Sequence, residues 1–68
     1  MTADEAKQSL FSQTPVTYNG IQYRKMTAII YRVGENGNLI VSAELLDKSE
    51  NSVTYAQIKD VRGDNDGN

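Results

Sequence analysis

The chain has 68 residues, a net charge of −2, and neither cysteine nor histidine. A core of this size supplies only about 3–5 kcal/mol of stability, so small domains usually add disulfides, a metal or oligomerisation. The composition excludes disulfides and the commonest metal ligands, which leaves a homo-oligomer as the expected source of further stability. The negative charge argues against general nucleic-acid binding, because such proteins neutralise many phosphates.

The N-terminal segment has the signature of a short helix. Thr2 is followed three residues later by Glu5, a capping box in which each side chain satisfies a backbone N–H of the other. We predict a helix over residues 3–11, whose narrow apolar stripe of Ala6 and Leu10 must dock elsewhere. The segment lacks the apolar run of a signal peptide or membrane span, and small secreted domains usually contain cysteine, so we expect a cytoplasmic protein without membrane contact.

From residue 16 onward, β-branched and aromatic residues between turn signals predict strands. Asn19 and Gly20 form the preferred pair for a type I′ turn, which predicts a hairpin between a strand at Val16–Tyr18 and one beginning at residue 21. This second strand continues to about residue 33, a length that predicts a bend or a bulge. A loop then leads into a third strand over residues 39–46.

The C-terminal third contains two short apolar pieces, at residues 53–55 and 58–61. Between them, Ala56 and Gln57 predict a kink or a single 3₁₀ turn. The polar residues 62–68 are expected to form a disordered tail.

These elements predict one small domain over residues 1–61 that is mainly β, or α+β by element count, with the β structure spanning residues 16–61. The expected architecture is a short N-terminal helix followed by a small antiparallel SH3-like barrel of four or five strands, with a bent open meander as the alternative. In strict alternation, the second strand has apolar residues on both faces, so a second subunit is expected to cover one of them. One face would hold Met26, Ala28 and Ile30, and the other Ile29, Tyr31 and Val33.

The sequence offers little for catalysis. Without histidine or cysteine the usual pairs of nucleophile and base cannot form, and the carboxylates of Glu44 and Asp47 are interpreted as surface charges. The acidic turn around Glu50 lacks the glycine and terminal glutamate of a calcium loop. We therefore expect a protein that is not an enzyme and that has no metal or cofactor.

Tyrosines interleaved with cations are the feature with the most functional potential. Aromatic faces beside positive charges can stack a base and hold its phosphate. The alternative is structural, because tyrosines are good strand formers that pack half-buried in small barrels. The candidate ligand- or partner-binding residues are Tyr23, Arg24, Lys25, Tyr31, Arg32 and Tyr55.

Five short segments carry a resemblance to known sequences. They are Thr14-Pro15-Val16, Tyr18 to Tyr23, Ala28 to Arg32, Ser42 to Lys48, and Asn51 to Thr54. Through them, residues 14–61 resemble small uncharacterised proteins encoded by phages and prophages of Clostridia-type (Gram-positive) bacteria. The resemblance implies an accessory protein in the cytoplasm of the host bacterial cell, and it assigns no functional residue.

Three functions follow as hypotheses. The first is a non-catalytic phage or prophage binding module that inhibits a host defence protein or sequesters a small anionic or nucleotide ligand. The second is an SH3- or KOW-like nucleic-acid-binding accessory module that uses Arg24, Lys25 and Arg32, ranked lower because of the net charge. The third is a structural phage assembly protein whose only ligand is protein.

Overall fold

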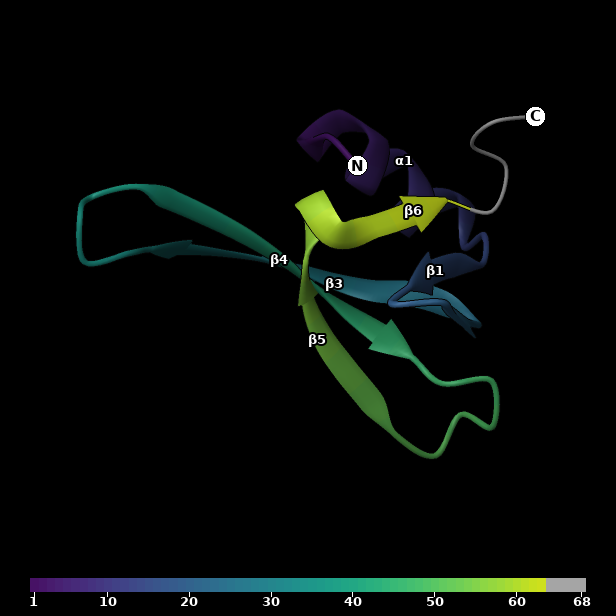
Figure 1. Cartoon of the computed structure of the whole chain (residues 1–68). Helices are drawn as coiled ribbons and strands as arrows, with labels where there is room; N and C mark the ends of the chain where they lie inside the picture. Colours follow the sequence, from purple (N-terminus) through teal and green to yellow (C-terminus); the bar gives the residue numbers. More distant parts are fainter. Residues whose placement is uncertain (64–68) are drawn as a thin grey trace.

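The computed structural model describes residues 1–63, and residues 64–68, which belong to the expected tail, lie outside the described part. This part contains one helix and six strands in two three-stranded antiparallel sheets, ordered β2-β1-β6 and β3-β4-β5 (Figure 1). The elements are α1 (Ala3–Ser12), β1 (Val16–Tyr18), β2 (Ile21–Tyr23), β3 (Lys25–Val33), β4 (Leu39–Leu46), β5 (Val53–Gln57), a 3₁₀ turn η1 (Ile58–Asp60), and β6 (Val61–Gly63).

The predicted helix and its capping box are confirmed. The Thr2 hydroxyl accepts a hydrogen bond from the Glu5 backbone N–H at 3.2 Å, and the Glu5 carboxylate accepts one from the Thr2 N–H at 2.7 Å. The helix ends at Gln13, which adopts the left-handed conformation with φ 58°. Ala6 and Ser9 face inward, and α1 packs against β3.

The predicted first hairpin is also confirmed. Asn19 and Gly20 have φ values of 54° and 76°, the positive angles that a type I′ turn requires at both central positions. Opposite β2, the other edge of β1 pairs with β6, so that Tyr18 faces Val61. The expected tail therefore starts too early, because Arg62 and Gly63 belong to a strand.

The long second strand is bent, as expected, and is divided at Arg24 into β2 and β3. A bulge between Met26 and Ala28 inserts one residue into β3. Beyond it, Ile29 faces Ala43 and Tyr31 faces Val41, on the same side of the sheet as the buried Met26. The strict alternation predicted for β3 is therefore wrong, because a bulge reverses the facing of every residue that follows it.

The strands do not close into a barrel. Within residues 1–63, β5 pairs only with β4 and β6 only with β1, and η1 carries the chain from one sheet to the other. The other link is the bent β2–β3 segment, in which β2 belongs to the first sheet and β3 to the second (Figure 1). The 3₁₀ turn was predicted at Ala56 and Gln57 but begins at Ile58, because β4 pairing extends β5 through Gln57.

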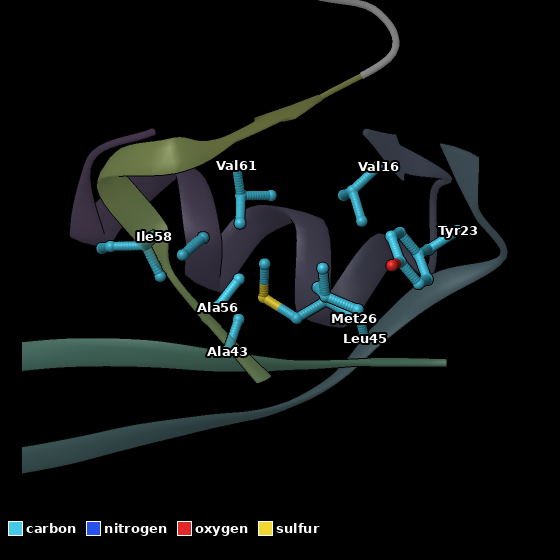
Figure 2. Close-up of a cluster of buried hydrophobic side chains, with 9 residues drawn as sticks. Val16, Tyr23, Met26, Ala43, Leu45, Ala56, Ile58 and Val61 are labelled. Atoms are coloured by element: carbon cyan, nitrogen blue, oxygen red, sulfur yellow. The ribbon is translucent and has the colours of Figure 1, made fainter. Parts of the chain in front are cut away.

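The core lies between α1 and the two sheets, as Figure 2 shows. Three of its members are alanines, whose small side chains let the helix and sheets approach closely. Its buried hydrophobic residues are Ala6, Val16, Tyr23, Met26, Ala43, Leu45, Ala56, Ile58 and Val61.

The distal part of the β3–β4 hairpin, residues 31–41, extends beyond this core and is called the arm below (Figure 1). On its core-side face Val33 stands opposite Leu39, and both remain mostly exposed. At its base Val41 packs against the core, and beyond it the arm leaves the apolar side chains of Val33 and Leu39 in solvent.

Candidate functional site

A surface cavity of about 470 Å³ lies where the end of α1, the β2–β3 junction and the β4–β5 loop meet. Three of its lining residues are cationic and none is acidic. Such one-signed lining concentrates anions, because the low-dielectric walls focus the field of the charges. The lining residues are Gln13, Pro15, Gln22, Tyr23, Arg24, Lys25 and Lys48.

Backbone pairing fixes the first two cations. The Arg24 N–H donates a 2.9 Å hydrogen bond to the Leu46 carbonyl, which ties the β2–β3 junction to the end of β4. Lys25 faces Leu46 in the register, and its Nζ donates to the Gln13 side-chain oxygen at 3.4 Å. This places a lysine near the carbonyl end of α1, where the helix dipole favours positive charge.

The third cation comes from the β4–β5 loop, residues 47–52. The Asp47 N–H donates to the Ser52 carbonyl at 3.0 Å and closes the loop, and the Asp47 carboxylate accepts bonds from the Ser49 hydroxyl and backbone N–H. These bonds, led by the Ser49 hydroxyl, hold the pKa of Asp47 below its ordinary value. The ordered loop brings Lys48 to the cavity.

The same loop carries an acid to the edge of the site. Glu50, in the left-handed conformation with φ 61°, pairs with Arg24 at 3.3 Å between Oε2 and Nε. Both side chains are more than half exposed, at 57% and 53%. Exposed pairs of this kind contribute little stability, so a stronger anion can displace Glu50 from the guanidinium.

A second cavity, of about 210 Å³, adjoins the first along the seam between α1 and β3. The two share Gln13 and Lys25, and the second adds apolar wall from Leu10 and Met26. The polar site therefore continues along this seam as a second, mainly polar groove.

The structure brings together three of the six predicted site residues, Tyr23, Arg24 and Lys25. Tyr23 is 7% exposed and its ring lies in the core, so it supports the cavity wall more than it offers a stacking face (Figure 2). Tyr31 and Arg32 are consecutive in β3 and point to opposite faces of the arm.

Tyr55 lies apart from both places, on β5 opposite Glu44. The six candidate residues therefore do not gather at one site. Tyr55 is 58% exposed, and its hydroxyl donates to Glu44 Oε2 at 2.7 Å, while the Thr27 hydroxyl donates to Glu44 Oε1 at the same distance. These bonds, the one from Tyr55 first, lower the pKa of Glu44, and the carboxylate raises the pKa of Tyr55.

Sequence reasoning missed Lys48 and the two glutamines. Lys48 stands alone among acids in a polar turn, which is typical of a solvated surface charge. Only the pairing of β4 with β3 shows that this turn lies beside Arg24. Gln13 is placed by the end of the helix, two residues beyond the bounds that the sequence predicted.

Residues 1–63 hold neither a cluster of metal ligands nor a membrane-spanning helix. No three His, Cys, Asp or Glu residues in this part gather into a group that could hold a metal ion. In the same residues no helix has both the length and the apolar character needed to cross a membrane.

No model of a known protein family matches the chain, and neither does any curated protein or solved structure.

Proposed function

We propose that this chain is a non-catalytic binding module whose ligand is a small anion, such as a nucleotide or another phosphate ester. The observation that carries the proposal is the cavity lined by Arg24, Lys25 and Lys48 without any acidic lining residue. Its volume of about 470 Å³ falls within the range of small-molecule sites, roughly 300–1,000 Å³. The Gln13 and Gln22 side chains supply amide groups of the kind that bind a sugar or base.

The resemblance to phage and prophage proteins supports a biological setting for this proposal. A small accessory protein in the cytoplasm of the infected bacterium serves the phage by sequestering a nucleotide-type host signal. The same three cations could instead bind an acidic segment of a host defence protein and so inhibit that protein.

As the finer description of the fold, we propose an open SH3-like arrangement. The support is the bent β2–β3 segment, which gives one half to each three-stranded sheet, as strands do at the corner between two crossing sheets. The return of β6 to β1 after a 3₁₀ turn also supports it.

Calorimetric titration of the full chain with pyrophosphate and with adenosine mono- and diphosphate tests the proposal, with neutral adenosine as the matched probe. We expect the anions to bind and adenosine not to bind. Arg24→Ala and Lys48→Ala should each weaken binding about tenfold or more, because a hydrogen bond to a charged group is worth about 1.5–3 kcal/mol. Lys7→Ala and Lys59→Ala remove exposed lysines that do not line the cavity and serve as controls.

The negative outcomes are equally specific. If no anionic probe binds at millimolar concentration, or if the control lysines matter as much as Arg24 and Lys48, the proposed function is wrong. If single-stranded oligonucleotides bind with a steep salt dependence while mononucleotides do not, the nucleic-acid hypothesis replaces it. If only phage particles retain the protein on co-sedimentation, an assembly role replaces it.

A further inference from the structure

The face of sheet β3-β4-β5 that points away from the core, called the outer face below, carries an arginine toward one end and a glutamate toward the other. Lys25, which stands opposite Leu46 beyond the glutamate, donates its Nζ hydrogen bond to Gln13 at the end of α1. Arg32 stands at one end opposite Ile40, and Glu44 stands toward the other end opposite Ala28. The register pair between them is Ile30 and Ser42, so the middle of the face is neutral. Because residues of a strand alternate, this face is opposite to that of the buried Ala43 and Leu45.

The acidic end of the outer face is held in place. The Thr27 and Tyr55 hydroxyls each donate to one oxygen of the Glu44 carboxylate at 2.7 Å. A carboxylate offers about four acceptor positions, so these two bonds leave room for a guanidinium. Arg32, by contrast, makes no ion pair within residues 1–63, where Arg24 and Glu50 form the salt bridge.

We propose that a second copy of this chain covers the outer face with its own outer face, so that Arg32 of each copy pairs with Glu44 of the other. A two-fold axis between the sheets and perpendicular to the strands reverses the strand direction. It therefore places the Arg32 end of one copy over the Glu44 end of the other, with Ile30 and Ser42 of both copies near the axis.

The dimensions allow this arrangement. Arg32 is four residues from Ala28, the register partner of Glu44, so the two charges are about 13 Å apart along the strands at about 3.3 Å per residue. Facing sheets pack about 10 Å apart, a gap that an arginine and a glutamate side chain bridge together. The same rotation forms both ion pairs, and this self-complementarity favours a copy of the chain over an unrelated partner.

Sedimentation equilibrium of the full chain, over concentrations up to the millimolar range, tests the proposal. Wild type should dimerise. Arg32→Glu and Glu44→Lys should each raise the dimer dissociation constant by about tenfold or more, since each places like charges together at two points. The double variant R32E/E44K should return the constant to within a few-fold of wild type, because it exchanges the charges across the same contact.

Glu44→Lys also removes the acceptor of Tyr55 and Thr27, so circular dichroism must show that each variant is folded. Lys59→Glu, an equal change of charge on η1, should leave association unchanged. A monomeric wild type, a double variant no better than the singles, or a dimer that tolerates both single changes would each overturn the proposal. None of these residues lines the 470 Å³ cavity. A variant that loses dimerisation should therefore still bind anions, and the two proposals can be tested separately.

Discussion

Tyr55 and Glu44 stand directly opposite one another where β5 pairs with β4, and the Tyr55 hydroxyl donates a 2.7 Å hydrogen bond to the Glu44 carboxylate. This bond stabilises the charged carboxylate together with the protonated phenol. The pKa of Glu44 is accordingly lowered and that of Tyr55 is raised. A single cross-strand contact thus ties the protonation of two exposed side chains to the folding of the sheet.

Removing the phenol hydroxyl should raise the pKa of Glu44. In Tyr55→Phe the largest cause of the lowered value is lost, and the Thr27 bond remains. Because the pKa of Glu44 is lower in the folded state, the stability it adds is present above the unfolded-state pKa and is lost as pH falls through the folded-state value. NMR titration of the side-chain carboxyl carbon measures the change.

Asp47 is the internal control for that titration. Its pKa is lowered chiefly by hydrogen bonds from Ser49 and not by Tyr55, so its titration midpoint should be the same in wild type and in Tyr55→Phe. A Glu44 midpoint that does not move in the variant would contradict the hydrogen bond.

Neutralising Glu50 should strengthen anion binding. Its carboxylate pairs with Arg24 at the edge of the cavity, so Glu50→Gln removes the anion that competes with a ligand for the Arg24 guanidinium. We expect a several-fold lower Kd for pyrophosphate, measured by calorimetry, since one exposed ion pair is worth about 0.2–1 kcal/mol. Glu35→Gln, at the tip of the arm, is the matched control. Weaker binding in Glu50→Gln would mean instead that Glu50 positions Arg24 for the ligand.

Two leucines of β4 should differ sharply when truncated. Leu45 is fully buried in the core, whereas Leu39 is 63% exposed on the arm. Leu45→Ala should lower the free energy of unfolding by about 2–5 kcal/mol, which is most of the stability of so small a domain. Leu39→Ala should change it by less than about 1 kcal/mol, because little area is removed from contact. Urea denaturation compares them, and equal losses would place Leu39 in a packed interface.

The type I′ turn should depend on its glycine through the backbone alone. Gly20 has φ 76°, and a Cβ built there meets no atom within 4 Å. Gly20→Ala should therefore cost about 1–2 kcal/mol of unfolding free energy, the typical cost of a left-handed conformation for a residue with a Cβ. Gly20→Asn should cost less, since asparagine tolerates this conformation. Equal stability of the two variants, by urea denaturation, would contradict this account.

The sequence predicted those elements whose causes are local. The capping box of Thr2 and Glu5, and the turn at Asn19 and Gly20, each depend on residues within three positions of one another. The division of the long strand at Arg24 and the bulge after Met26 were not located, because they depend on how the second sheet turns over the core.

The candidate site shows the same limit. Arg24 and Lys25 were found because their charges stand beside Tyr23 in the sequence. Lys48 is brought to them by a loop more than twenty residues away, and nothing in its own neighbourhood marks it. Tyr31 and Arg32 are neighbours in the sequence, yet strand geometry sends them to opposite faces.

The pairing of β6 with β1 has a consequence for the order of events during synthesis. Strands β3, β4 and β5 are joined by short loops and can assemble as soon as residue 57 has left the ribosome. Sheet β2-β1-β6 must wait for residues 61–63, which also provide the carbonyl of Val61 that the Met1 amino group contacts at 3.3 Å. Truncation before Val61 should therefore leave β1 with an open edge and the nascent domain prone to pair with other chains.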